Sequence, residues 1–441
     1  MPKVNIISLG CSKNLVDSER VLRRLQDAGF NAVHEADSFT DGAVIINTCG
    51  FISDAKQESI DTILEACELK KDGVIDRVYV MGCLSQRYAD DMPGLIPDVD
   101  AWFGKFDWDG VVGRLKSDYL PAAPTPQRKS PQWDRTITTP SHHAYLKIAE
   151  GCNRFCAFCA IPLITGRFHS RPVDEVLEEV RELVSRGVHE FNIIAQDLSS
   201  YGRDLPGVPA GASHFADLLE RMADIEGVEW IRLHYAYPSD FPYEILPVMA
   251  SRSNICKYLD IALQHIDDTV LANMQRHITA EDTRRLLERI RREVPGIHIR
   301  TTLMVGFPGE THQAFSRLMD FVSEQRFERM GAFAYCEEED TAAARNFSDS
   351  ISDEVKEDRL NRVMALQEQI SLEHNQAKIG QILRVIIDSE EDGTYIGRTE
   401  FDSPEVDPEV FVYTDKSLEK GQFYNVRITD ATPFELVAEL C

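Results

Sequence analysis

Three cysteines stand close together near the middle of the chain, at Cys152, Cys156 and Cys159. Their C-x₃-C-x₂-C spacing follows a strand-like run, and thiolates are the ligands that iron–sulfur clusters require. Three cysteines can hold three irons of a [4Fe-4S] cluster and leave the fourth iron open to chelate another molecule. A ferredoxin run has a different spacing and a Cys-Pro ending, and a zinc site would need a second cysteine pair. The spacing therefore predicts a cluster with one open iron.

A second set of cysteines lies in the first 120 residues. Cys11, Cys49 and Cys83 each end an apolar, strand-like run. Ligands of an open α/β sheet bind outside the carboxyl ends of the strands, so three thiols placed there converge. A glycine beside each cysteine lets the backbone come close to a bulky group. The pattern predicts a second cluster, again with three protein ligands, and the alternative is three separately buried cysteines.

The remaining four cysteines carry no such pattern. Cys67 falls in an expected helix, Cys256 just before a strand, and Cys441 at the end of the chain, which predicts structural or incidental roles. Cys336 ends an expected strand, where packing is favoured over a role in a cavity.

The elements that must position these cysteines fall into three regions. Residues 1–120 alternate strand-like runs (4–9, 43–46, 77–81) with amphipathic helices (15–28, 53–69). This alternation predicts a doubly wound parallel sheet with helices on both faces. Four prolines between Pro121 and Pro131 then indicate an extended linker over residues 121–137.

The second region, residues 138–377, contains six strand–helix units followed by a long charged helix from Asp353. The expected strands are 144–149, 190–195, 229–235, 258–263, 298–305 and 329–335. Six such units predict a partial (β/α)₆ barrel, whose active site would lie at the carboxyl ends of the strands. Polar residues expected there include Gln196, Gln264 and Arg300, any of which could also be an ordinary buried polar residue.

The third region, residues 378–441, changes to short alternating runs separated by turn residues, which predicts a small antiparallel β-barrel. It has six basic and fourteen acidic side chains, a net charge of −8, within a chain whose net charge is −26. Nucleic-acid affinity depends on Lys and Arg, so direct nucleic-acid binding is not expected and a basic protein partner is favoured. No apolar run approaches the roughly 20 residues that span a bilayer, and no signal-peptide pattern is present, so we expect a cytoplasmic protein without membrane contact.

The C-x₃-C-x₂-C motif, with the aromatic Phe158 before its last cysteine, resembles the radical S-adenosylmethionine (SAM) superfamily. The resemblance implies that SAM chelates the open iron and is cleaved by one electron to a 5′-deoxyadenosyl radical. It suggests Phe158, Gln196, Gln264 and Arg300 as residues of the SAM pocket. Arg171 joins them because it follows the cysteine loop, as Arg167 does; either arginine could bind a carboxylate or form a surface ion pair.

The two cysteine sets, their order and the C-terminal module together resemble the methylthiotransferases over essentially the whole chain. Residues 8–19 resemble the branch that modifies ribosomal protein S12, since Ser12 stands where the tRNA-modifying branch usually has Gln. Asn47-Thr-Cys49 and residues 263–265 and 306–310 also fit the family.

That resemblance implies an auxiliary [4Fe-4S] cluster on Cys11, Cys49 and Cys83, a radical SAM cluster, and a C-terminal barrel of the TRAM type. It further implies methylthiolation of the β-carbon of an S12 aspartate, with one SAM donating the methyl group and a second the radical. A flavodoxin or ferredoxin would supply the electrons. The alternatives are a tRNA adenosine methylthiotransferase, for which a basic barrel is expected, and a non-enzymatic iron–sulfur carrier.

Overall fold

The computed structural model describes residues 1–36, 39–120, 131, 133–209 and 211–441. Most of the predicted linker, residues 121–137, lies outside the described residues. The chain forms two compact units. The first consists of residues 1–138 with 150–153 and 159–168, and the second of residues 139–149, 154–158 and 169–441.

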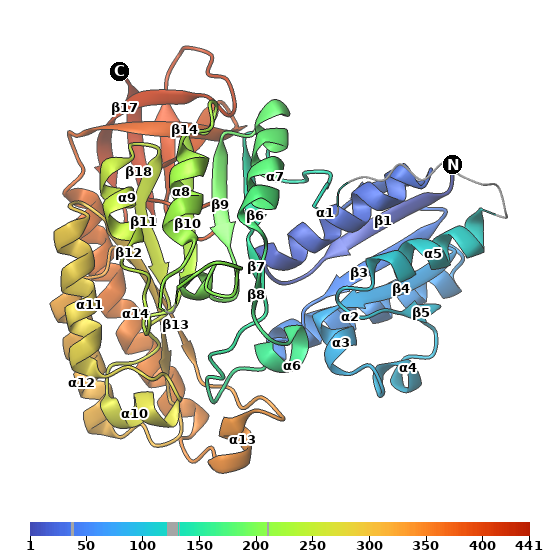
Figure 1. Cartoon of the computed structure of the whole chain (residues 1–441), viewed down its shortest axis with the longest axis horizontal. Helices are drawn as coiled ribbons and strands as arrows, with labels where there is room; N and C mark the ends of the chain where they lie inside the picture. Colours follow the sequence, from blue (N-terminus) through green and yellow to red (C-terminus); the bar gives the residue numbers. More distant parts are fainter. Residues whose placement is uncertain (37–38, 121–130, 132, 210) are drawn as a thin grey trace. The chain divides into compact units, whose positions relative to one another are not determined.

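The first unit is built on a five-stranded parallel sheet with the order β2-β1-β3-β4-β5 (Figure 1). Its strands are β1 (Lys3–Ser8), β2 (Asn31–His34), β3 (Ala43–Thr48), β4 (Arg77–Gly82) and β5 (Ala101–Trp102). This order confirms the doubly wound sheet expected from the strand–helix alternation. The sequence did not reveal β2 and β5, which are four and two residues long.

Helices cover both faces of this sheet because its strands are apolar on both sides. The helices are α1 (Ser12–Asp27), α2 (Ser53–Lys71), α3 (Cys83–Arg87), α4 (Met92–Leu95) and α5 (Trp108–Tyr119). Ile45 packs in a core with residues of α1 and α5, whereas its neighbour Ile46 packs in a second core with residues of α2. Successive side chains of a strand point to opposite faces, so each of these strands contributes to both cores.

The second unit contains six parallel strands in the order β13-β12-β11-β10-β9-β6, which confirms the partial (β/α) barrel. The strands are β6 (His143–Lys147), β9 (Glu190–Ile194), β10 (Trp230–Ala236), β11 (Ile255–Ile261), β12 (His298–Val305) and β13 (Arg329–Ala334). The main helices are α7 (Val173–Ser185), α8 (Phe215–Ala223), α9 (Ile245–Ser251), α11 (Ala280–Glu293), α12 (His312–Gln325) and α14 (Asp353–Gln376). Short elements complete the middle of the chain: α6 (Ile161–Thr165), β7 (Ala149–Glu150), β8 (His169–Ser170), η1 (Leu198–Ser200), α10 (Asp268–Asn273) and α13 (Ala342–Asn346).

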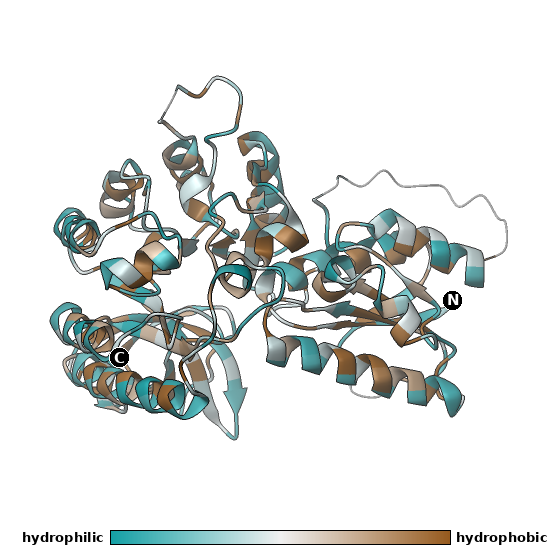
Figure 2. Ribbon diagram, turned by 90° about the horizontal axis from the view of Figure 1, so that it is seen from below, coloured by the Kyte–Doolittle hydropathy of each residue, from teal (hydrophilic) through white to brown (hydrophobic). Residues whose placement is uncertain are grey.

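The helices are amphipathic, as packing on a sheet requires, and both teal and brown residues alternate along them in Figure 2. None of the described helices is both long and apolar enough to cross a membrane.

A closed five-stranded barrel ends the chain. Its strands are β14 (Ile382–Glu391), β15 (Thr394–Thr399), β16 (Glu409–Tyr413), β17 (Phe423–Ala431) and β18 (Glu435–Leu440). The expectation of a wholly antiparallel barrel was wrong in one ladder, because β16 and β18 run parallel. A ring with an odd number of strands cannot alternate direction throughout, so closure requires at least one parallel pair.

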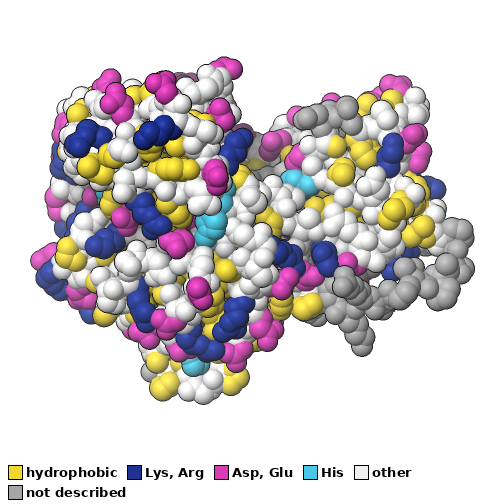
Figure 3. Space-filling view, turned by 90° about the horizontal axis from the view of Figure 1, so that it is seen from above, with side chains coloured by type: hydrophobic (Ala, Val, Ile, Leu, Met, Phe, Trp, Pro, Cys, Tyr) yellow, Lys and Arg dark blue, Asp and Glu magenta, His cyan; other side chains and the backbone are white. Residues whose placement is uncertain are grey.

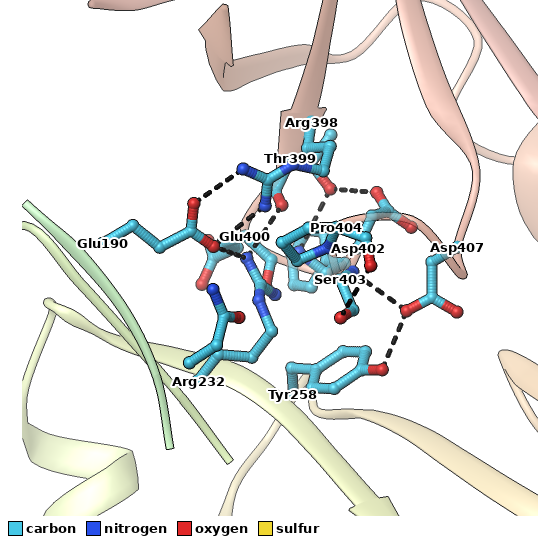
Figure 4. A network of polar contacts seen from close by, with 12 residues as sticks. Glu190, Arg232, Tyr258, Arg398, Thr399, Glu400, Asp402, Ser403, Pro404 and Asp407 are labelled. Atoms are coloured by element: carbon cyan, nitrogen blue, oxygen red, sulfur yellow. Dashed lines mark hydrogen bonds and ion pairs between the residues drawn. The ribbon is translucent and has the colours of Figure 1, made fainter. Parts of the chain in front are cut away.

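Buried ion pairs join this barrel to the parallel sheet within the second unit (Figure 4). Glu190, the first residue of β9, accepts hydrogen bonds from Arg398 of β15 at 2.9 and 2.7 Å and from Arg232 of β10 at 3.2 Å. Arg329 of β13 pairs with Asp402 at 2.5 Å. Charges taken out of water are stable only when they are paired, so the two sheets depend on each other.

A buried histidine beside this network makes the stability sensitive to pH. His143 of β6 is 3% exposed, and neither of its ring nitrogens has a hydrogen-bond partner among the described residues. Burial lowers its pKa from 6.5 to about 4. Between those values the unfolded chain binds a proton that the folded chain does not, so stability should fall by about 3 kcal/mol as the pH drops from 6.5 to 4.

We expect His143→Phe to remove this contribution, because phenylalanine fills a similar volume without a basic nitrogen. Urea unfolding of the two proteins between pH 4 and 7 tests the prediction. The exposed His169→Phe serves as the control, and an unchanged pH dependence in His143→Phe would contradict the assignment.

Candidate functional site

The three N-terminal thiols lie at one edge of the first sheet. Cys49 and Cys83 directly follow β3 and β4, and Cys11 follows β1 and precedes α1. Strands β1, β3 and β4 are neighbours, although β2 stands between β1 and β3 in the chain. The winding direction changes between β1 and β3, and such a switch point is where open α/β sheets bind ligands.

Two glycines allow the cysteine loops to touch. A Cβ on Gly10, whose φ is +90°, would lie 2.8 Å from the Cβ of Cys49. A Cβ on Gly50 would lie 2.8 Å from the backbone nitrogen of Leu84 and 2.9 Å from the carbonyl carbon of Cys83. Neither position has room for a side chain, so the glycines are required for the close approach of the three loops.

The three thiols influence one another electrostatically. All ten cysteines of the chain lie in its described part, and none of them forms a disulfide bond. The pKa of Cys49 is raised to about 11, mainly by burial and in part by negative charge on Cys11 and Cys83. Three thiols therefore meet at a switch point, on loops whose glycines leave no room for a side chain. This arrangement fits the ligand set of an iron–sulfur cluster.

Asn14, on the first turn of α1, ties these loops together. Its Nδ2 donates hydrogen bonds to the carbonyl oxygens of Leu9 and Thr48, both at 3.0 Å. Its Oδ1 accepts a hydrogen bond from Cys83 Sγ at 3.5 Å. One amide therefore contacts the loops of all three cysteines.

Lys105 is a residue of this site that the sequence did not reveal. It is 2% exposed, and its Nζ lies 3.0 Å from Oδ2 of Asp17 and 3.2 Å from Oδ1 of Asn14. Burial alone would lower the pKa of Lys105, but Asp17 and the neighbouring thiols raise it well above its ordinary value. The residue is therefore a buried cation beside the thiols.

The central cysteines lie on a single loop between β7 and α6. Cys152 is buried, and Cys156 and Cys159 are half-buried. The loop needs Gly151, whose φ is +79°, because a Cβ there would lie 2.2 Å from the carbonyl oxygen of Arg167. The backbone nitrogen of Cys152 donates to the carbonyl oxygen of Gly166 at 3.3 Å.

Cys156 has two polar neighbours from distant segments. Its Sγ lies 3.3 Å from Nη1 of Arg276 and 3.6 Å from Oη of Tyr237. The guanidinium groups of Arg276 and Arg154 lie 4.1 and 4.3 Å from the centre of the Tyr237 ring. Hydrogen bonds to a ligating sulfur tune the potential of a cluster. No local pattern could have found these residues, which lie about 80 and 120 positions away in the chain.

Gln264 and Gln196 follow the carboxyl ends of β11 and β9, as expected. Gln264 has a φ of +70°, an uncommon conformation for a residue with a side chain. Its Oε1 is buried without a hydrogen-bond partner among the described residues, which suits a group that awaits a polar ligand. Gln196 is half-buried.

Arg171 is half-buried and forms two ion pairs, one with the partly exposed Glu175 and one with the buried Glu179. It donates to Glu175 at 2.9 Å, to Glu179 at 2.6 Å and to the carbonyl oxygen of Lys147 at 2.7 Å. Its Nη2 has no partner among the described residues, so one donor remains for a ligand. Arg167 is exposed.

Arg300 does not lie at a strand end, and that expectation was wrong. It is the third residue of the eight-residue strand β12. Its Nη1 lies 3.7 Å from Oδ1 of Asp260, and its Nε lies 3.4 Å from Oδ1 of Asp407. This placement gives no support to a SAM contact, which stays a prediction.

Phe158 packs on the core of the second unit, with its ring centre 6.4 Å from that of Phe307. Cys336, expected to be packed, is exposed.

Comparison with known proteins gives three family matches. Residues 146–322 match the Radical SAM superfamily, residues 3–104 match the uncharacterized protein family UPF0004, and residues 379–441 match the TRAM domain. The ribosomal protein uS12 methylthiotransferase RimO of Porphyromonas gingivalis is 53% identical over 440 residues, which cover 99% of each chain. The protein of the same name from Bacteroides fragilis is 52% identical, again over 99% of each chain.

Among solved structures, the radical SAM methyltransferase TsrM from Kitasatospora setae has a similar fold. Its TM-score is 0.56 at 16% identity, and the match covers 78% of this chain and 77% of that one. The likeness concerns the fold alone.

Proposed function

Since this chain belongs to the ribosomal protein uS12 methylthiotransferase family and is a radical SAM methylthiotransferase, we propose that it adds a methylthio group to the β-carbon of an aspartate in ribosomal protein uS12. The observation that carries the proposal is the second thiol set, at the switch point of the first sheet. A radical SAM loop alone is compatible with many reactions. A further cluster site with an open iron supplies a place for the sulfur that the product must gain.

The proposal divides the work between the two thiol sets. Cys152, Cys156 and Cys159 hold one [4Fe-4S] cluster, and Cys11, Cys49 and Cys83 hold the other. When bound, SAM at the first cluster supplies radical chemistry that activates a C–H bond, and the second cluster supplies the sulfur to be methylated and transferred. Three cysteines in each set leave one iron of each cluster without a protein ligand.

Residues around the central loop have supporting roles in this proposal. Gln264 and Gln196 bind SAM through side-chain amides at the strand ends, and Arg171 contributes its remaining N–H donor. Phe158 shields the loop on its apolar side. Arg276 and Tyr237 orient the sulfur of Cys156 through the contacts described above.

The charge of the C-terminal barrel supports a basic protein as the substrate. Its fourteen acidic side chains outnumber six basic ones, and opposite charge favours encounter and orientation of partners. On the face drawn in Figure 3, basic and acidic side chains of the described residues are interspersed, without the continuous basic surface typical of a tRNA-binding face. We also propose a flavodoxin or ferredoxin as the electron donor and the cytoplasm, where uS12 is made, as the location.

Mass spectrometry of uS12 from cells that lack the gene tests the proposed function. We expect uS12 to lose a methylthio mass increment on an aspartate, and to regain it when the gene is restored. Analysis of tRNA nucleosides from the same cells is the matched control, because loss of a methylthioadenosine with unchanged uS12 would assign the chain to the other substrate.

A further inference from the structure

The buried ammonium group of Lys105 stands out in a site otherwise made of thiols and amides. It belongs to the loop after β5, and it pairs with Asp17, which is 1% exposed. Burying a charge is costly unless it is paired, and this pair is neutral as a whole. A charged pair is therefore buried at the same place where the three thiols meet.

The ammonium group lies next to the thiols themselves. Oδ1 of Asn14 accepts from Lys105 Nζ at 3.2 Å and from Cys83 Sγ at 3.5 Å, so the ammonium and the thiol share one acceptor atom. Lys105 therefore places its positive charge within electrostatic reach of both Cys49 and Cys83.

Binding of an iron–sulfur cluster changes the net charge of this site. A cluster takes its cysteines as thiolates, so its binding places negative charge on all three sulfurs. An anionic sulfur ligand at the open iron adds further negative charge. Asp17 and Glu150 already place negative charge near Cys83, whereas Lys105 and, near Cys11, Lys13 supply positive charge. Of these two lysines, Lys105 is the buried one, and a charge acts most strongly where water is excluded.

We propose that Lys105 is a positioning residue for the sulfur to be transferred: its ammonium group stabilises a monoanionic sulfur ligand, hydrosulfide or methanethiolate, at the open iron of the cluster held by Cys11, Cys49 and Cys83. The inference rests on the proposed function and deepens it, because it names the charge state of the ligand that this site selects. The competing explanation is a purely structural role, in which Lys105 only neutralises Asp17.

The two explanations differ in the effect of removing each partner. If Lys105 acts on the ligand, Lys105→Met weakens anion binding, whereas Asp17→Asn leaves the ammonium group without its carboxylate partner and strengthens binding or leaves it unchanged. If the pair is only structural, both variants damage the site in the same direction. Lys105→Arg keeps the charge and should retain most of the binding.

The experiment uses the full chain with Cys152, Cys156 and Cys159 replaced by Ala, so that only the N-terminal cluster gives a signal. Sodium methanethiolate is titrated against the reconstituted protein and followed by electron paramagnetic resonance of the reduced cluster, with iron per chain measured in parallel. We expect at least a tenfold increase in the dissociation constant for Lys105→Met and none for Asp17→Asn. The midpoint potential should fall in the first variant and rise in the second, because positive charge favours the reduced cluster.

Equal binding by Lys105→Met and the parent chain would overturn the inference, as would equal weakening by both substitutions. Weaker methanethiolate binding by Asp17→Asn than by the parent chain also overturns the inference. If Lys105→Met fails to retain iron, the result for Asp17→Asn decides between the two explanations. A parent chain that holds about four irons but binds no methanethiolate would instead contradict the proposed function itself.

Discussion

Replacing Cys152, Cys156 and Cys159 by Ala is expected to abolish methylthiolation of uS12 and to leave about four iron atoms per chain. The loss should be complete, because the variant keeps no cysteine in the central loop that could ligate the cluster. The remaining iron should be retained because the N-terminal set has its own sheet, glycines and tethering amide. Iron analysis, detection of 5′-deoxyadenosine and mass spectrometry of uS12 measure the three consequences.

The reciprocal variant, with Cys11, Cys49 and Cys83 replaced by Ala, is the matched control. It should also hold about four irons and should still cleave SAM under reducing conditions, yet transfer no methylthio group. The two variants thus lose the same product for different reasons. A first variant without any iron would contradict the assignment of the N-terminal cluster, and SAM cleavage by that variant would contradict the assignment of the central one.

Glu190→Ala is expected to have the largest effect on stability, a loss of about 3–5 kcal/mol. The carboxylate is fully buried and lies among the guanidinium groups of Arg398 and Arg232, both also buried. Burial alone would raise the pKa of Glu190, but Arg398 and then Arg232 hold it far below its usual range. Among the described residues, removal of the carboxylate leaves Arg398 with Asp388 as its remaining carboxylate partner and Arg232 with only backbone carbonyl oxygens, in a buried site.

Denaturant unfolding of the variant measures this loss. The matched control is Glu182→Ala, which removes the same residue type from an exposed pair with Arg186 at 2.9 Å. An exposed pair contributes less than about 1 kcal/mol. Equal effects of the two substitutions would show that burial does not govern the strength of the Glu190 pair.

The sequence allowed prediction of the elements that have a clear period and of the cysteines that follow them. Strand β12 was expected over the residues it occupies, and α14 begins at Asp353 as expected. Strands β2 and β5 were missed because such short runs have no period to detect. Arg300 was misplaced because its polarity suggested a strand end, whereas its partner Asp407 comes from the C-terminal barrel.

The polar residues around the thiols were beyond sequence reasoning for a different reason. Asn14 stands just before the predicted helix 15–28 and close to Cys11, but its contacts with Thr48 and Cys83 exist only once three strands align. Lys105 follows a two-residue strand and has no pattern around it. Arg276 approaches Cys156 from the segment after α10. Tertiary structure, rather than local periodicity, creates these neighbours.

The buried ion pairs between the C-terminal barrel and the parallel sheet limit how this protein can be rearranged. Arg398 and Asp402 belong to the barrel, and their partners Glu190 and Arg329 belong to the sheet. A barrel taken from a related protein would bring its own side chains to these positions. Glu190 and Arg329 would then lose their ion-pair partners. Exchange of the barrel by recombination therefore succeeds only when the residues on both sides of this contact are inherited together, so the buried ion pairs are an evolutionary constraint as well as a structural one.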